Sequence, residues 1–314
     1  MISLKERVVG GVLGLAVGDA LGVPVEFKAR ERIRRSPVRG MIGFGSHGQP
    51  AGTWSDDTSL ALCSVESLLG GFDVEDTGKR FVRWLYEGHW TARGDVFDYG
   101  TTTAGAIGRI RRGSPAGQAG ATDERSNGNG SLMRILPHAL YFRSGPVEQM
   151  LDAVHCASAI THAHAISLVA CGIYGLIVRN LLAGVEPVPA YKDACEAARP
   201  AYEGTEMGDH LKKFDRFLSG TLHLLPEAEI RSGGFVVETL EAAVWSFLTT
   251  GSYEAVVLRA VNLGEDTDST GAVVGGLAGV HYGTAGIPCE WLEVLARRGD
   301  IEALAERFAG TIQG

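Results

Sequence analysis

Cysteine is scarce in this chain, and its spacing fits no common cysteine site. Five cysteines occur among 314 residues, an odd number, and no two form a CxxC pair. A disulfide framework or a zinc site is therefore not expected, and a reducing cytoplasm is the simplest expected location. We interpret all five as small buried apolar side chains, namely Cys63, Cys156, Cys171, Cys195 and Cys289.

The chain also lacks a surplus of basic residues and a long apolar run. Its net charge of -8 argues against a nucleic acid or an anionic membrane as partner, because both attract Lys and Arg. The apolar run over residues 8–17 is closely bracketed by Glu6, Arg7 and Asp19. It falls short of the roughly 20 apolar residues that span a bilayer, so we expect a buried helix and no membrane partner.

Segments that alternate apolar and polar residues are nearly absent, and helical spacing dominates instead. Ser3 and Glu6 fit a capping box, and the helix that follows should end near Pro24. Helical periodicity recurs over residues 60–69, 150–155, 166–182 and 239–247. No linker or repeat divides the chain, so we predict one compact all-α domain over residues 1–314, an orthogonal helical bundle, with a monomer favoured.

Two kinds of segment need separate expectations. Near the C-terminus, Pro288 suits a first helical turn, Gly299 a helix stop and Asp300 a cap for the last helix. Residues 27–52 and 112–130 read as long irregular stretches, and such loops in a compact domain are often functional. For the arginines of the first stretch, we prefer a mobile surface loop.

Two short acidic clusters each precede an apolar helix, in the sequences GTWSDDTS and GEDTDST. Ser, Thr and Asp are preferred helix caps, so capping would explain either cluster alone. Two clusters with duplicated carboxylates and hydroxyls, each beside glycine, exceed what capping requires. If the two helix starts converge, four carboxylates would crowd one pocket and repel one another unless protons or cations intervene. Oxygen ligands suit magnesium or manganese, so we hypothesise a site that two such ions share.

With these clusters, the motifs along the chain resemble those of the ADP-ribosylglycohydrolases, most closely the dinitrogenase reductase-activating glycohydrolase branch. In order they read GDALGVPVEF, WSDDTS, FDYGTTT, NGNGSLMR, THAH and GEDTDSTGAVVGGLAG. The resemblance covers residues 18–279 and implies an all-α fold. It also implies a dinuclear site, with two Mg²⁺ or Mn²⁺ ions, at the base of an ADP-ribose cleft.

The resemblance implies a role for each matching residue. The metal ligands would be Ser55, Asp56, Asp57, Asp266, Asp268 and Ser269. Glu26 and Asp98 would be the catalytic carboxylates, and His162 would contact the substrate. The loop around the diphosphate and ribose would consist of Asn127, Gly128, Asn129, Gly130, Ser131 and Met133.

The sequence departs from the common family pattern at three positions. Ser55 and Ser269 stand where threonine is usual, which keeps a hydroxyl ligand, and Glu265 stands where a second glycine is common. A core or capping role competes with substrate contact for His162 and is preferred for His164. No GxGxxG motif follows a strand, which excludes a Rossmann interpretation.

The resemblance implies a hydrolase that releases ADP-ribose from a modified protein side chain, and we expect this side chain to be arginine. Other hypotheses are serine-, nucleobase- or small-molecule-linked ADP-ribose as substrate, a metal-dependent phosphohydrolase, and an ADP-ribose-binding protein without catalysis. Retention of Glu26, Asp98 and the acidic clusters argues against the last of these.

Overall fold

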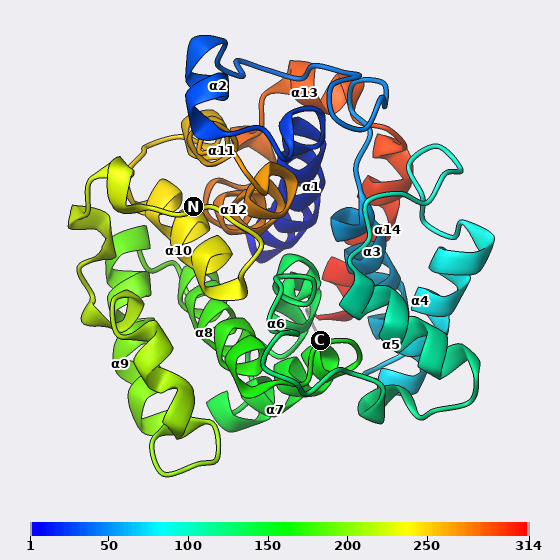
Figure 1. Cartoon of the computed structure of the whole chain (residues 1–314), viewed down its shortest axis with the longest axis vertical. Coiled ribbons are helices and arrows are strands. Elements are labelled where there is room, and N and C mark those ends of the chain that lie inside the picture. The colour runs from blue at the N-terminus through cyan, green and yellow to red at the C-terminus, as the bar shows by residue number, and fades with distance from the viewer. Residues whose placement is uncertain (1, 313–314) are drawn as a thin grey trace.

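The computed structural model describes residues 2–312, which form α-helices joined by loops and short 3₁₀ turns (Figure 1). The first seven helices are α1 (Leu4–Gly22), α2 (Arg30–Arg35), α3 (Asp56–Leu68), α4 (Val74–Glu87), α5 (Thr101–Arg111), α6 (Leu136–Tyr141) and α7 (Val147–Ala159). The others are α8 (Ala165–Leu182), α9 (Pro187–Tyr202), α10 (Val236–Leu248), α11 (Tyr253–Val261), α12 (Thr267–Tyr282), α13 (Cys289–Val294) and α14 (Arg298–Thr311). No strand forms among the described residues, so the predicted all-α class is confirmed.

Local sequence signals placed several of these helices correctly. The predicted capping box is present: the Ser3 side chain accepts from the Glu6 backbone N–H, and the Glu6 carboxylate accepts from the Ser3 N–H. The four periodic segments lie in α3, α7, α8 and α10. The predicted range 1–314 includes residues 1, 313 and 314, which lie outside the described residues.

The expected boundary near the C-terminus was wrong. Gly299 and Asp300 both lie inside α14, which begins at Arg298. The preceding residue, Arg297, has a left-handed backbone (φ 53°) that turns the chain, and its guanidinium donates to the Asp300 carboxylate at 2.7 Å. A side-chain pair across the first turn thus replaces the predicted glycine stop and aspartate cap.

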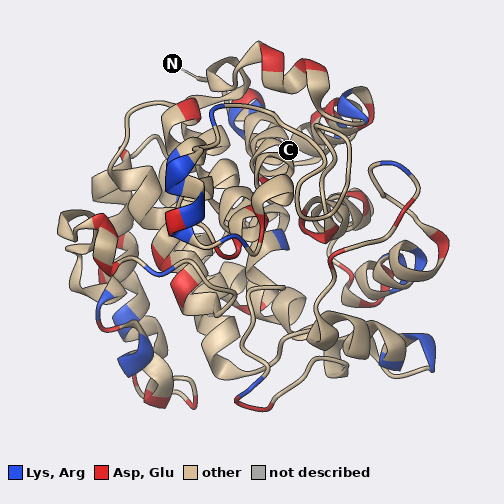
Figure 2. Ribbon diagram, turned by 45° about the horizontal axis from the view of Figure 1, so that its top comes forward, with Lys and Arg blue, Asp and Glu red and all other residues tan. Residues whose placement is uncertain are grey.

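Two further expectations need correction. Cys156 and Cys289 are exposed, whereas Cys63, Cys171 and Cys195 are buried as predicted. Four of the five arginines in residues 27–52, Arg30, Arg32, Arg34 and Arg35, lie in the short helix α2, and Arg39 follows it. Figure 2 shows Lys and Arg in blue and Asp and Glu in red over the whole molecule. Arg30 is not on a free surface loop, because it donates to the carbonyl oxygens of residues 227, 230 and 263.

Helices α1 and α12, from opposite ends of the sequence, lie side by side in the middle of the molecule (Figure 1). Their contact is made by glycines. A Cβ atom placed on Gly18 would lie 2.0 Å from the Gly271 carbonyl oxygen, and one on Gly275 would lie 2.2 Å from the Gly14 oxygen. Only glycine allows such an approach, because any side chain would overlap the facing backbone. This confirms that the glycine-rich helix after Asp268 packs closely on another helix.

Helices α1 and α8 are each long enough and apolar enough to cross a membrane. The apolar stretch of α1 is therefore longer than the run over residues 8–17 suggested. That stretch is entirely buried inside the protein, and 72% of the corresponding window of α8 is buried. Burial against other helices accounts for their apolar character.

We predict that Gly18→Ala lowers the free energy of unfolding by about 3 kcal/mol or more, because overpacking strains a rigid backbone contact. Gly310→Ala is the matched control, since Gly310 lies in α14 with open space around its Cβ position. It should be neutral or stabilise by up to about 1 kcal/mol. Denaturant unfolding of both variants measures the difference, and equal effects would contradict a tight α1–α12 contact.

Candidate active site and metal centre

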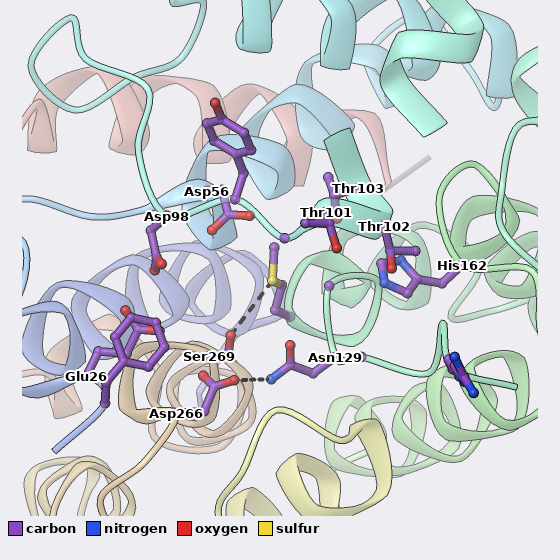
Figure 3. A pocket seen from close by; sticks show the side chains of 17 residues that line it. Glu26, Asp56, Asp98, Thr101, Thr102, Thr103, Asn129, His162, Asp266 and Ser269 are labelled. Atoms are coloured by element: carbon purple, nitrogen blue, oxygen red, sulfur yellow. Dashed lines mark hydrogen bonds between the residues drawn. The ribbon is translucent and has the colours of Figure 1, made fainter. Parts of the chain in front are cut away.

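A cavity of about 350 Å³ opens where α1, α3, α5 and α12 meet the loop before α6 (Figure 3). Carboxylates line one part of it: Glu26, Asp56, Asp98 and Asp266. The lining continues through residues 99–103, Arg125, residues 128–130, Met133, His162 and Ser269. Segments that are far apart in the sequence therefore share one pocket.

The two acidic clusters converge here, as hypothesised. Asp56 and Asp57 form the first turn of α3, with Ser55 as its N-cap accepting from the Asp57 N–H. Asp266 is the N-cap residue of α12, and Asp268 lies in its first turn. Glu26, Asp266 and Asp268 each place a carboxylate oxygen within 4.8 Å of the others.

The α1–α12 contact fixes this convergence. The Thr267 hydroxyl donates to the Gly22 carbonyl oxygen at 2.8 Å, which ties the start of α12 to the end of α1. A Cβ atom on Gly22 would lie 2.3 Å from the Asp268 backbone. Glu26 follows α1 by one short 3₁₀ turn, so the same contact brings Glu26 beside the second cluster.

Asp19 is a site-forming residue that the sequence analysis missed. It is fully buried in α1, and its carboxylate accepts from the Ser55 N–H, the Thr58 N–H and the Thr58 hydroxyl at 2.6–3.1 Å. It therefore holds the start of α3 against α1. Burial raises its pKa to about 7, against the opposing effect of these hydrogen bonds. The available signal was an aspartate inside an otherwise apolar helix.

Three buried carboxylate oxygens have no hydrogen-bond partner: Oδ1 of Asp57, Oδ1 of Asp266 and Oδ2 of Asp268. Buried polar atoms are nearly always paired, so these orphans indicate that something absent from the protein satisfies them. Burial, and then the neighbouring carboxylates, raise the pKa of Asp56, Asp57 and Asp268 well above the usual range. An all-oxygen set of repelling carboxylates fits a hard divalent cation.

The two serine hydroxyls predicted as ligands occupy different settings. The Ser269 side chain lines the cavity, where it contacts Met133 Sδ at 3.9 Å. Burial raises the pKa of Asp266, and a hydrogen bond with Ser269 opposes this larger effect. The Ser55 hydroxyl donates to Asp57 Oδ2 at 3.1 Å. Both lie beside the orphaned oxygens, and their ligand roles stay predictions.

Glu26 and Asp98 lie together at the mouth, and His47 joins them. His47 Nε2 contacts Glu26 Oε2 and lies 3.7 Å from Asp98 Oδ1. Burial, and then the Asp98 charge, raise the pKa of Glu26 to about 11. The sequence analysis missed His47, because a lone histidine in the segment GSHGQ carries no pattern that separates it from a surface residue.

Only some of the residues predicted for the glycine-rich substrate loop line the cavity. Gly128, Asn129, Gly130 and Met133 line it, and Asn129 Nδ2 donates to Asp266 Oδ2 at 2.9 Å. Two members face the protein instead. The Asn127 amide bonds Ser167 and the Glu124 carbonyl, and the buried Ser131 hydroxyl accepts from Ser158. These side chains hold the loop in place.

Two groups in the lining had been assigned no role from the sequence, although residues 101–103 belong to the FDYGTTT motif. Residues 101–103 begin α5, whose Gly100 N-cap has no side chain to accept from the first N–H groups. Arg125 is the only Lys or Arg among the lining residues. His164 caps α8 by accepting from the Ile166 N–H at 3.3 Å, which agrees with its preferred capping role.

Comparison with known proteins identifies relatives. The ADP-ribosylglycohydrolase family model matches residues 1–314. ADP-ribosylarginine hydrolase Tri1 of Pseudomonas putida (strain GB-1) is 34% identical, covering 96% of this chain and 78% of that protein. The ADP-ribosyl-(dinitrogen reductase) glycohydrolase of Rhodospirillum rubrum is 32% identical, covering 93% and 91%. A solved structure of an ADP-ribosylglycohydrolase-related protein complex is similar with a TM-score of 0.83 and 35% identity over 99% of both chains.

We predict that Mn²⁺ stabilises the protein more at about pH 8 than at about pH 5. Carboxyl groups with raised folded-state pKa values stabilise the cation-free fold below about pH 4, and that contribution is lost as the pH rises. A bound cation replaces the protons, so at the higher pH an excess of Mn²⁺ over EDTA should raise the Tm by roughly 5 °C.

Asp268→Asn should abolish most of this Mn²⁺-dependent rise in Tm. Asp193→Asn, which removes an exposed carboxylate on α9, should leave it intact. A rise that is independent of pH, or that survives Asp268→Asn, would refute the assignment of the orphaned oxygens to a cation.

Proposed function

The chain belongs to the ADP-ribosylglycohydrolase family, and we propose that it hydrolyses the glycosidic bond between ADP-ribose and an arginine side chain of a modified protein. The observation that carries the proposal is the set of buried carboxylate oxygens without a partner on Asp57, Asp266 and Asp268. Asp266 and Asp268 each place a carboxylate oxygen within 4.8 Å of Glu26. Two Mg²⁺ or Mn²⁺ ions would satisfy the unpartnered oxygens. Asp56, Asp57, Asp266, Asp268 and the hydroxyls of Ser55 and Ser269 would hold these ions.

The chemistry assigned to the site follows from its charges. The bound ions would supply positive charge that holds the ribose hydroxyls and acidifies a water molecule. Glycosidic cleavage passes through an oxocarbenium-like state and uses carboxylates around the anomeric carbon. Glu26 and Asp98 lie at that end of the cavity, and His47 connects them. We treat them as one coupled pair that gives a proton to the leaving group and takes one from the attacking water.

An arginine acceptor is supported by the mouth of the cavity as well as by the names of the relatives. Phe27 is 70% exposed and Tyr99 is 46% exposed, and both line the cavity beside Glu26 and Asp98. A guanidinium ion binds well against aromatic faces and beside carboxylates. Two relatives are named as an ADP-ribosylarginine hydrolase and a dinitrogen reductase glycohydrolase. A serine acceptor would present no positive charge to this rim.

We predict that Asp268→Ala loses Mn²⁺ binding and activity together. Release of ADP-ribose should fall by about a hundredfold or more, because the cation can no longer be held. The measurement is calorimetry with Mn²⁺, followed by product analysis on substrates with arginine-, serine- and nucleobase-linked ADP-ribose. A metal-free but active Asp268→Ala enzyme would refute the role of the site. Inorganic phosphate as the product would instead support a phosphohydrolase, and tight ADP-ribose binding without any turnover would support a binding protein.

Phe27→Ala should raise the KM for an ADP-ribosylarginine substrate by about three- to tenfold and change kcat little, because a cation–π contact is lost. Phe44→Ala is the matched control. Phe44 is similarly exposed and also has a positive φ, but it does not line the cavity. Steady-state kinetics on arginine- and serine-linked substrates separate the two. Equal effects of the two variants, or an equal loss on the serine linkage, would argue against a guanidinium subsite at Phe27.

A further inference from the structure

A buried cation lies behind the cavity without an acidic partner. Arg134 is fully buried, and its hydrogen bonds among the described residues go to a carbonyl and a hydroxyl, not to a carboxylate. Its guanidinium donates to the Ala157 carbonyl at 3.1 Å and to the Thr161 hydroxyl oxygen at 2.8 Å, and it lies over the Phe81 ring. Burial lowers its pKa to about 10, so it is still a cation near neutral pH. It can only donate hydrogen bonds.

The Thr161 hydroxyl has one hydrogen, and its destination can be deduced. The oxygen accepts from Arg134 and lies 2.8 Å from His162 Nδ1. Thr161 is fully buried, and its hydroxyl forms no further hydrogen bond among the described residues. If Nδ1 carried a proton, the hydroxyl hydrogen would be buried without an acceptor, which is costly. The hydroxyl therefore donates to Nδ1.

This direction determines the state of the His162 ring. With Nδ1 as an acceptor, a neutral ring must carry its hydrogen on Nε2. Burial, and then the Arg134 charge, lower the pKa of His162 to about 3, so the ring is neutral at physiological pH. The hydrogen bonds from Arg134 to Thr161 and from Thr161 to His162 thus place the single ring hydrogen of His162 on Nε2.

That N–H faces the cavity. His162 lines it, is 2% exposed, and makes no hydrogen bond through Nε2 to any described residue (Figure 3). The ring packs against Gly130, where a Cβ atom would lie 2.8 Å from His162 Cε1. The uncapped start of α5 and Arg125 line the same cavity, and both offer further hydrogen-bond donors. Donors of this kind match a ligand with anionic oxygens.

We propose that Thr161, oriented by Arg134, is a positioning residue that holds His162 as the Nε2–H tautomer, so that His162 donates to an oxygen of the ADP-ribose diphosphate. The identity of the ligand rests on the proposed function, whereas the tautomer does not. A neutral donor of fixed direction keeps its hydrogen bond to the diphosphate at any pH at which the protein is folded and the ring is neutral.

The tautomer is measured by ¹⁵N NMR of the histidine-labelled protein without ligand, which requires no variant. We expect His162 to be neutral, with its hydrogen on Nε2. A hydrogen on Nδ1, or a doubly protonated ring near neutral pH, would overturn the inference. Thr161→Val should give a mixture of tautomers, and Thr161→Ser, which keeps the hydroxyl, should restore the single form. A single Nε2–H form in Thr161→Val would remove Thr161 from the mechanism.

Binding of ADP-ribose in the presence of Mn²⁺, measured by calorimetry, tests the consequence. Thr161→Val should weaken binding roughly tenfold, and Thr161→Ser should bind nearly as the parent protein does. In a His162→Ala background, Thr161→Val should cause no further loss, because Thr161 acts through the ring. An equal loss in both backgrounds would show a merely structural role.

The two measurements separate failure of this inference from failure of the proposed function. If the parent protein does not bind ADP-ribose, the assignment of the ligand fails together with the proposed function. If it binds ADP-ribose but the His162 hydrogen is on Nδ1, the proposed function stands and this inference is wrong.

Discussion

The close approach of α1 and α12 is the constraint on which the site depends. Facing glycines bring the two backbones into contact, and a helix pair with ordinary side chains would hold them farther apart. Asp19 and Glu26 come from one side of this contact, and Asp266 and Asp268 come from the other. The glycine contact between α1 and α12 therefore opposes electrostatic repulsion. It holds together carboxylates that would separate in the absence of a counter-charge.

Among the described residues, three of the six non-glycine residues with a left-handed backbone lie in or beside this site. Phe27, Asp98 and Glu265 all have left-handed backbones, with φ values of 61°, 56° and 62°. The Phe27 N–H donates to the Glu265 carbonyl, and the Glu265 N–H donates to the Lys28 carbonyl. This pairing accounts for a side chain at position 265 in a conformation that glycine adopts more easily. Each such residue costs on the order of 1 kcal/mol, and strained residues persist where the surrounding structure requires them.

The fold could be predicted where a signal is local. The capping box at Ser3, the apolar periods and the glycine-rich helix each describe one stretch of chain, and the structure confirms them. The signals at Gly299 and Asp300 failed because α14 begins before both residues, after a left-handed turn at Arg297. Composition gives no sign that a non-glycine residue adopts this conformation there.

The site could be predicted only in part from the sequence. Its acidic clusters are visible as motifs, but other residues of the site depend on contacts that the sequence does not show. Asp19 and His47 contact residues elsewhere in the chain, namely Ser55 and Glu26. Thr161 contacts the next residue, His162, inside the protein. No periodicity records such contacts. The family motif likewise could not separate loop members that face the cavity from those, such as Ser131, that face the core.

The pairing of α1 with α12 also bears on how the protein is made. A ribosome completes α1 long before α12 exists, so the glycine surface and the apolar faces of α1 stay uncovered through most of translation. The carboxylates of the first cluster meet those of the second only after almost the whole chain has been synthesised. Assembly of this carboxylate cluster is thus a late step in biogenesis, and the nascent N-terminal helix leaves its apolar faces open to aggregation until then.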